Sequence, residues 1–416
     1  MYALYSLAWL FLLPTAFLYL LWRSRRQPEY RAHWPERLGF VPPAQVTPVI
    51  WIHAVSVGET HAAAPLVRAL RAHFPQHHLY LTHATPTGRA AARQLFGDEI
   101  RQSYLPYDLP VCMHLFLQRV RPSLGIIMET EIWPNLLHAC QKRQIPVVLV
   151  NARLSARSAR RYQWFAPLTR RALQALQAIA AQTHDDAARL ATLGAKAIQV
   201  TGNLKFDVTP PHETDERTAV LRHLFAGRFV FLCASTREGE EAMLLDALTT
   251  LAIPGLLIVL VPRHPQRFSE VAELLHSRAT PFARRSLAEH ITDATRVFLG
   301  DSMGEMAAYY AAADVCYVGG SLLPFGGQNL IEAAAAACPA LIGPHTWNFA
   351  EAAEQAVALG AAERVDGMTA LQETLMRLYT SPAQRRHMSQ AGKTFATTNR
   401  GATQRVLKLV EDNLAS

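Results

Sequence analysis

Short apolar runs alternate with longer amphipathic stretches along most of this chain. Runs rich in Val, Ile, Leu and Phe predict five strands in the first half of the sequence and five in the second half. The predicted strands are 49–55, 79–82, 124–128, 147–150 and 198–201, followed by 229–233, 257–261, 297–299, 315–318 and 340–342. Because Ala-, Leu- and Arg-rich helical patterns separate them, the strands are expected to form parallel sheets with right-handed crossovers.

The alternating pattern is interrupted near the middle of the chain by Thr209-Pro210-Pro211. A length of 416 residues exceeds one typical domain, and half of the residues are hydrophobic, which excludes a disordered chain. We therefore predict an α/β protein with two domains, residues 23–208 and 209–416. The last helix of the second domain is expected to be able to pack back on the first.

The first 22 residues contain no charged side chain. As a helix this segment matches the ~30 Å hydrocarbon core of a membrane, and Pro14 would kink it without excluding it. Arg23, Arg25 and Arg26 follow the segment, whereas a cleaved signal peptide starts with basic residues and ends at small ones. The positive-inside rule then predicts an uncleaved single-pass anchor with the remaining chain in the cytoplasm. A buried core helix is the alternative.

Charge is distributed unevenly between the two halves. Residues 1–210 hold 23 Lys and Arg against 11 Asp and Glu, a net charge of +12, whereas residues 211–416 hold 18 against 22, a net charge of −4. The basic half is expected to meet an anionic partner such as lipid headgroups, phosphates or nucleic acid. No recognisable DNA- or RNA-binding motif supports the last of these.

Cysteine and histidine give no sign of a metal site. Five widely spaced cysteines form no C-x-x-C pair, so neither a disulfide framework nor a zinc site is indicated. His73, His77 and His78 flank Pro75 in a predicted turn, which favours a solvated loop.

In open parallel sheets, ligands bind beyond the carboxyl ends of the strands. Two first-half strands are followed there by acidic residues. Glu59 follows the first, in the run Ser56-Val57-Gly58-Glu59, before a helix expected to begin near His61. Glu129 and Glu131 follow another, and strand alternation would point them to the same side. Glu59 is either a complement to the helix dipole or a general base for a hydroxyl nucleophile.

A basic and aromatic segment follows the strand at 147–150. Arg153, Arg157, Arg160 and Arg161 are expected to share a helix face, followed by Tyr162, Trp164 and Phe165. A solvated helix face and a contact with an anionic membrane are both compatible with this pattern.

The second half has cationic and glycine-rich strand ends instead. Arg263 and His264 stand between two prolines, a rigid loop suited to an anion. The loop from Gly319 to Asn329 is rich in glycine, whose backbone N–H groups can approach a phosphate, and Glu332 follows it within a helix, where it could accept from a ribose diol. A nucleotide site is therefore predicted, without a Walker A or G-x-G-x-x-G sequence.

Seven motifs, in this order and spacing, resemble the bacterial Kdo (3-deoxy-D-manno-octulosonic acid) transferase family of lipopolysaccharide synthesis over nearly the whole chain. They are Ser56-Val57-Gly58-Glu59, Glu129-Thr130-Glu131-Ile132-Trp133-Pro134-Asn135, Asn151-Ala152-Arg153-Leu154-Ser155, Gly202-Asn203-Leu204-Lys205-Phe206-Asp207, Pro262-Arg263-His264-Pro265, Met303-Gly304-Glu305 and Gly326-Gly327-Gln328-Asn329. Position 328 departs from the pattern, because many members carry His where this chain has Gln328.

The resemblance implies a GT-B glycosyltransferase, with two Rossmann-like domains facing each other across a cleft, at the inner membrane. It implies metal-independent, inverting transfer of Kdo from CMP-Kdo to the lipid A precursor, lipid IVA, with no cofactor. Glu59 matches the family's general base. The positions that match its CMP-contacting segments are Pro262, Arg263, Met303, Gly304, Glu305, Asn329, Leu330, Ile331 and Glu332. Further candidates for holding donor or acceptor are Ser56, Gly58, Glu131, Arg153, Lys205, Gly326 and Gly327.

Other functions remain open from the residues alone. Another GT-B enzyme, such as a nucleotide-sugar epimerase or a lipid-linked hexosaminyl transferase, would prefer uridine to cytidine. A membrane-tethered scaffold would keep nucleotide binding without catalysis, but retention of Glu59 beside the second-half motifs argues against it.

Overall fold

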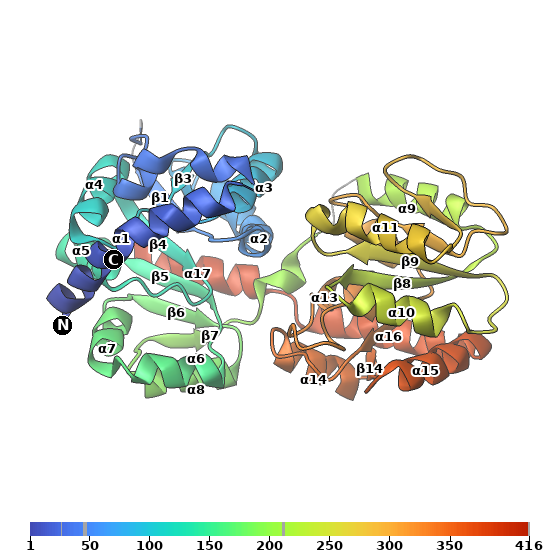
Figure 1. Ribbon diagram of the computed structural model, residues 1–416. Helices are drawn as coiled ribbons and strands as arrows, with labels where there is room; N and C mark the ends of the chain where they lie inside the picture. The colour runs from blue at the N-terminus through green and yellow to red at the C-terminus, as the bar shows by residue number, and fades with distance from the viewer. Residues whose placement is uncertain (26, 45–47, 210–212, 415–416) are drawn as a thin grey trace. The chain divides into compact units, whose positions relative to one another are not determined.

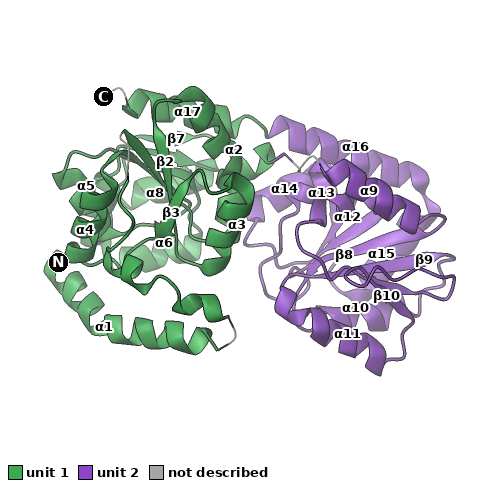
Figure 2. Ribbon diagram, turned by 90° about the horizontal axis from the view of Figure 1, so that it is seen from above, with its two compact units in different colours: residues 1–208, 400–416 green, residues 209–399 purple. Residues whose placement is uncertain are grey.

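The computed structural model describes residues 1–25, 27–44, 48–209 and 213–414. The chain forms two compact units, one of residues 1–208 and 400–416 and the other of residues 209–399 (Figure 2). Arg26 of the basic cluster and the Pro210-Pro211 pair of the predicted boundary lie outside the described residues.

Unit 1 is built on a seven-stranded sheet in the order β3-β2-β1-β4-β5-β6-β7 (Figure 1). Its strands are β1 (Val49–His53), β2 (His78–His83), β3 (Arg101–Tyr104), β4 (Pro122–Met128), β5 (Val147–Ala152), β6 (Ala178–Ala181) and β7 (Ile198–Val200). Its helices are α1 (Tyr2–Arg23), α2 (Val57–His73), α3 (Pro86–Phe96), α4 (Pro110–Val120), α5 (Pro134–Lys142), α6 (Ala156–Gln163), α7 (Ala166–Gln174), α8 (His184–Thr192) and α17 (Ala402–Leu414), with 3-10 turns η1 (Pro28–Arg31), η2 (Trp34–Leu38) and η3 (Leu204–Asp207).

Unit 2 carries a second seven-stranded sheet, in the order β10-β11-β9-β8-β12-β13-β14. Its strands are β8 (Phe229–Thr236), β9 (Leu256–Pro262), β10 (Phe282–Arg284), β11 (Val297–Leu299), β12 (Val315–Val318), β13 (Ala340–Ile342) and β14 (Ala362–Arg364). Its helices are α9 (Glu213–Leu224), α10 (Glu240–Leu248), α11 (Phe268–Ser277), α12 (Met306–Ala312), α13 (Ile331–Ala335), α14 (Ala350–Ala358), α15 (Met368–Thr380) and α16 (Pro382–Thr398), with the 3-10 turn η4 (Pro265–Arg267).

Both sheets are parallel at every described strand pair and buried on both faces, which confirms the predicted α/β class. In unit 1 one core joins the sheet to α2, α3 and α17, and a second core joins its other face to α4, α5 and α7. Continuous apolar runs such as Ile50-Trp51-Ile52 form these strands because both sides of each strand meet helices. Parallel strands also bring all their carboxyl ends to one edge of each sheet.

The ten predicted strands are all present, and four more complete the sheets. Three of the four, β3, β10 and β14, lie at sheet edges, where half-exposed strands need no apolar run. The fourth, β6, has the sequence Ala-Ile-Ala-Ala and contains only one of the β-branched residues typical of strands.

Helix α17 begins directly after unit 2 ends and packs on α2 and η3 of unit 1 (Figure 2). Asp207 of η3 fixes its first turn by accepting from the Gly401 and Thr403 amides at 2.7 and 2.6 Å. Residues 400–414 therefore belong to unit 1 rather than to the second domain.

Candidate active site

The carboxyl edge of the unit 1 sheet gathers the acidic motifs. Glu59 lies in the first turn of α2, which begins at Val57 and not near His61 as the sequence suggested. Ser56 is the N-cap residue, and its hydroxyl accepts from the Glu59 amide. The pair forms a capping arrangement of the S-x-x-E type, because the Glu59 carboxylate reaches back to the same turn.

The Glu59 carboxylate is 9% exposed and is held by two donors. The Val55 amide donates to Oε2 at 2.8 Å, and the Ser56 hydroxyl donates to Oε1 at 3.0 Å. These bonds favour the charged form, but burial and the charge of Glu129 outweigh them and raise the pKa of Glu59 to about 8. Glu59 thus has a capping role and also the pKa of a general base that works near neutrality.

Glu129 and Glu131 both act electrostatically on Glu59, so the two motifs share one site. β4 ends at Met128, and Glu129 adopts the left-handed conformation with φ of 56°, so strand alternation does not orient the two carboxylates as expected. Lys205 of η3 lies 3.5 Å from Glu129 and brings a cation into the cluster. Burial raises the pKa of Glu131, although the Trp133 indole donates to it at 2.9 Å.

Asn151 near the end of β5 and Arg153 just after it extend this edge. Asn151 has φ of 54° and accepts from the Leu204 amide at 3.0 Å, which ties β5 to the turn that carries Lys205. Arg153 lies before α6 begins at Ala156, so it does not share a helix face with the later arginines. Its backbone carbonyl instead accepts a short hydrogen bond from Thr130, beside Glu129.

Tyr162 of the basic and aromatic segment packs against the core of unit 1, whereas the remaining members lie on the surface of α6 and of the residues after it. Arg157, Arg160 and Arg161 are exposed, and Trp164 and Phe165 are 79% and 65% exposed. Large exposed aromatic side chains next to arginines are typical of surfaces that meet a partner or a lipid interface.

Helix α1 has 22 residues and a mean hydropathy of 1.8, enough by length and composition to cross a membrane. It lies along unit 1 instead of projecting from it (Figure 2). Tyr2 stacks on His138, the Ser6 hydroxyl lies 3.1 Å from the Asn135 amide, and Phe17 packs against Trp34. Its other face is exposed and apolar, with Leu4, Phe11 and Leu18 at least 65% exposed.

In unit 2 the sheet's carboxyl edge is cationic where the sequence predicted it. Arg263 and His264 follow β9, and the Arg263 amide donates to Thr236 at the end of β8. Burial and the charges of Arg237 and Arg263 lower the pKa of His264, so the two guanidinium groups lie close to one imidazole. This cluster suits an anion such as a nucleotide phosphate.

The glycine-rich loop after β12 folds back on itself beside that cluster. The Gly327 amide donates to the Gly320 carbonyl at 2.7 Å, and the Gln328 side chain lies against Gly320. Gly326 has φ of 91°, and a Cβ there would come within 2.5 Å of Trp347 and Asn348, so the position requires glycine.

The residue that anchors this loop is Glu240, which was not among the predicted site residues. Glu240, in the first turn of α10, is buried and accepts from the Gly320 amide at 2.7 Å and from the Tyr317 hydroxyl at 2.5 Å. The signal was present in the run Thr236-Arg237-Glu238-Gly239-Glu240-Glu241, where three glutamates follow a buried strand.

The helix after the glycine-rich loop, α13, has only five residues. Asn329 accepts from the Ile331 amide at 3.2 Å and donates to Glu332 at 2.8 Å, so it orders the first turn of this helix. Leu330 and Ile331 are buried, so a ligand would meet their backbone. Glu332 and Arg263 both act on the buried Tyr310 hydroxyl, which places the two motifs in one neighbourhood.

The Met303-Gly304-Glu305 motif precedes α12. Met303 is 60% exposed, and Gly304 has φ of 76° with open space beside it. Burial would raise the pKa of Glu305, but hydrogen bonds from Arg285 and Ser302 lower it. Arg285, which the sequence did not single out, grips the Glu305 carboxylate at 2.8 and 3.0 Å, so Glu305 is held as a fixed anion.

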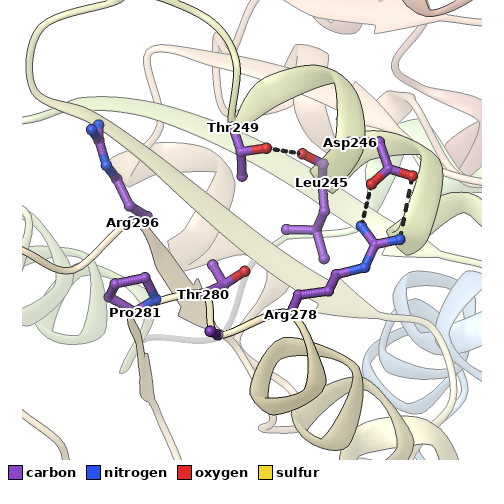
Figure 3. A pocket seen from close by; sticks show the side chains of 8 residues that line it. Leu245, Asp246, Thr249, Arg278, Thr280, Pro281 and Arg296 are labelled. Carbon is purple, nitrogen blue, oxygen red and sulfur yellow. Dashed lines mark hydrogen bonds and ion pairs between the residues drawn. The ribbon is translucent and has the colours of Figure 1, made fainter.

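A pocket of about 420 Å³ lies elsewhere in unit 2, lined by residues of α10 and residues just before β10 and β11 (Figure 3). Arg278 and Asp246 form an ion pair at 2.6 Å in its wall. Because its strand-linked residues precede their strands, the pocket lies at the amino edge of the sheet, opposite the predicted nucleotide motifs.

No group of three or more His, Cys, Asp and Glu side chains suited to a metal ion occurs within the described part of the chain. All five cysteines are buried and unpaired.

This chain is similar in sequence to a family of known transferases. A family profile described as 3-Deoxy-D-manno-octulosonic-acid transferase (kdotransferase) matches residues 32–208. The 3-deoxy-D-manno-octulosonic acid transferase of Bordetella pertussis is 45% identical over 98% of this chain and 98% of its own length. The enzyme of that name from Haemophilus influenzae is 41% identical over 94% and 93%.

Solved structures with lower sequence identity show the fold. The S. aureus MnaA–UDP structure matches with a TM-score of 0.62 and 16% identity, covering 88% of this chain and 96% of that one. The UDP-GlcNAc 2-epimerase of Neisseria meningitidis matches with a TM-score of 0.60 and 17% identity, covering 88% and 100%. The epimerase alternative therefore shares the architecture, but the high-identity relatives are transferases. The chain belongs to the 3-deoxy-D-manno-octulosonic acid transferase family and is a glycosyltransferase with the GT-B fold.

Proposed function

We propose that this enzyme transfers Kdo from CMP-Kdo to a hydroxyl of the lipid A precursor, lipid IVA, with inversion at the anomeric carbon and without a metal. The observation that carries this proposal is Glu59, a buried carboxylate at the carboxyl edge of the unit 1 sheet whose pKa is raised to about 8. An acceptor hydroxyl is a poor nucleophile until a base removes its proton, and a base with a pKa near the working pH does so best.

In the proposed reaction the Glu59 carboxylate takes the proton of the acceptor hydroxyl. The hydroxyl oxygen forms a bond to the anomeric carbon of Kdo as the bond from that carbon to the CMP phosphate oxygen breaks. CMP leaves with the electron pair of that bond. Glu131, Arg153 and Lys205 lie close enough to the Glu59 cluster to bind Kdo or the acceptor, and Gly58 has no crowding neighbour that would block a ligand.

Unit 2 supplies the proposed CMP site. Arg263 would stabilise the phosphate as negative charge develops on the leaving group. The glycine-rich loop with Gly326 and Gly327, the first turn of α13 and the Met303-Gly304-Glu305 segment would bind the nucleoside through backbone groups and the Glu332 carboxylate. The assignment to cytidine follows from the resemblance of these motifs to the family.

We also propose that α1 attaches the enzyme to the inner membrane, with both units in the cytoplasm. A helix that spans the bilayer must release the contacts of Tyr2, Ser6 and Phe17 with unit 1. A helix lying in the membrane surface keeps them. Because the five native cysteines are buried, Leu4→Cys in the full chain gives a clean label site. Labelling by an impermeant maleimide from the periplasm indicates a span, and labelling only in inverted vesicles indicates a surface helix.

The function is tested by incubating the detergent-solubilised chain with CMP-Kdo, generated in situ, and purified lipid IVA in the presence of EDTA. Mass spectrometry should show product heavier by one or more Kdo residues, with UDP-GlcNAc as the control donor giving none. Transfer that appears only when a divalent cation replaces EDTA contradicts metal independence. No increment from CMP-Kdo, with binding of CMP retained, overturns the substrate assignment while leaving the GT-B fold intact.

A further inference from the structure

A buried arginine in η2 has no carboxylate partner among the residues that the structure describes. Arg37 is 5% exposed, and its Nη2 donates to the Ala84 carbonyl at 3.1 Å. Its guanidinium lies 4.1 Å from the centre of the Tyr104 ring, and its Nε is buried without a hydrogen-bond partner. The neighbouring Glu36 is engaged by Arg89 at 2.7 Å.

Burying a cation without an ion-pair partner is costly, and burial lowers the pKa of Arg37 although the nearby charge of Glu36, which Arg89 already engages, acts in the opposite direction. The Tyr104 ring and one carbonyl offset only part of the lost hydration. An anionic ligand beside the guanidinium would supply the missing charge, and phosphate has the geometry that arginine binds best.

The Arg37 guanidinium reaches the turn that leads into α3. Thr85, the residue after Ala84, caps this 11-residue helix by accepting from the Gly88 amide at 3.1 Å. The first turn contains no acidic residue, and Thr87 is exposed there. The positive end of a helix and a buried arginine therefore meet at one place, which is a favourable site for an anion.

The same turn touches the loop that holds Glu59. The amides of Ala84 and Thr85 donate to the Val55 carbonyl at 3.2 and 3.3 Å, while the Val55 amide donates to Glu59. A Cβ on Gly88 would lie 3.2 Å from the Ser56 carbonyl carbon, so α3 packs directly against the N-cap of α2. The first turn of α3 is therefore in direct contact with the loop that holds Glu59.

Three other residues of η2, Trp34, Pro35 and Leu38, line an apolar groove. With Phe17 and Phe40 they line an open groove of about 470 Å³, and Leu38 follows Arg37 directly in the sequence. One short element therefore presents a cation toward α3 and hydrocarbon-binding side chains toward α1. A ligand that carries both a phosphate and acyl chains matches this combination, whereas a free phosphate would leave the groove unused.

We propose that Arg37 and the first turn of α3 bind a phosphate monoester of the lipid acceptor, with an acyl chain in the groove beside η2. This proposal rests on the proposed function, because it assigns a part of the acceptor to residues next to Glu59. The site orients the acceptor so that its hydroxyl reaches the base.

The first test is ³¹P NMR of a soluble probe, the deacylated glucosamine disaccharide with its two phosphates, titrated with the full chain in detergent. Wild type should broaden one of the two resonances more than the other, and Arg37→Gln should abolish that difference. Thr87→Glu should abolish it too, and this variant should fold because an acidic residue in the first turn stabilises a helix. Gln94→Glu, exposed near the end of α3, adds the same charge and should bind as wild type does.

The second test compares transfer to lipid IVA with transfer to the acceptor lacking each phosphate in turn. Arg37→Gln and Thr87→Glu should raise KM for the phosphorylated acceptor about 10-fold or more and leave KM for one dephosphorylated acceptor unchanged. Selective broadening that persists in folded Thr87→Glu overturns the site. Selective broadening of the probe by the wild-type chain, without transfer of Kdo by the wild type or any variant, supports the phosphate site and overturns the proposed function. Inorganic phosphate that competes for the site as well as the acylated acceptor does overturns the assignment to a lipid.

Discussion

Both units are built on a parallel seven-stranded sheet, but they have opposite chemistry at the carboxyl edge. In unit 1 that edge gathers Glu59, Glu129 and Glu131 around a single lysine. In unit 2 it presents Arg237, Arg263 and glycine-rich backbone, and its carboxylates are tied to donors. One fold thus supplies both the proposed proton-accepting site and the proposed anion-binding site.

The difference comes from what surrounds each carboxylate rather than from the carboxylate itself. Burial and the like charge of Glu129 raise the pKa of Glu59 to about 8. Burial acts on Glu305 in the same direction, but the hydrogen bonds from Arg285 and Ser302 reverse it. Burial therefore raises the pKa of a glutamate in this fold only where hydrogen bonds to its carboxylate do not outweigh the effect of burial.

The largest effect is expected from removing the proposed base of unit 1. Glu59→Gln should lower kcat at least 100-fold, because general-base catalysis contributes about 10²–10⁴-fold. The affinity for CMP, measured by calorimetry, should stay within about twofold because CMP is assigned to unit 2. Glu99→Gln, an exposed control in unit 1, should retain wild-type turnover. Near-normal turnover of Glu59→Gln would contradict the assignment of Glu59 as the general base.

The matching change in unit 2 removes the proposed phosphate ligand. Arg263→Gln should weaken CMP binding by about 10- to 100-fold, the effect expected for a charge-assisted hydrogen bond. Arg278→Gln is the matched control, because Arg278 belongs to the same unit but precedes β10 and so lies at the opposite, amino edge of its sheet. Equal CMP affinities for the two variants would contradict the placement of the phosphate.

A smaller effect concerns stability. A carboxyl group whose pKa is raised in the folded state binds a proton that the unfolded chain has released, so its contribution to stability falls as pH rises from about 4.5 to about 8. Glu59→Gln should therefore raise the free energy of unfolding at pH 8 by roughly 1–3 kcal/mol and by much less at pH 5. Urea unfolding followed by tryptophan fluorescence reports this, since six of the seven tryptophans lie in unit 1. A gain of the same size at both pH values would disprove the linkage.

The fold was largely predictable because continuous apolar runs mark strands that are buried on both faces. The missed strands β3, β10 and β14 lack such runs because they lie at sheet edges, and β6 because alanine gives no strand signal. Periodicity also failed where the backbone leaves the strand: Glu129, at φ of 56°, breaks the alternation that its spacing suggested.

The sequence predicted which motifs contribute to the candidate site, but not the contacts between them. Glu59 could be placed at a strand end, but its raised pKa depends on Glu129, which is 70 residues further along the chain and reaches it only through β1–β4 pairing. The roles of Glu240 and Arg285 could not be predicted for a related reason. The sequence shows the acidic run that contains Glu240, but it does not show that Glu240 holds the Gly320 loop or that Arg285 holds Glu305, because these contacts join segments distant in sequence.

The smallest expected effect is a shift in the pH dependence of kcat/KM, and it is specific to the acidic cluster of unit 1. Glu129→Gln removes a negative charge that acts on Glu59, so the midpoint of the rising limb of kcat/KM against pH should move to lower pH. Lys205→Met removes the cation paired with Glu129, so the midpoint should move to higher pH. Each shift should be about 0.3–1 pH unit, because the groups are partly exposed and screened. Midpoints that move in the same direction would show that Glu129 and Lys205 act on substrate binding alone and not through Glu59.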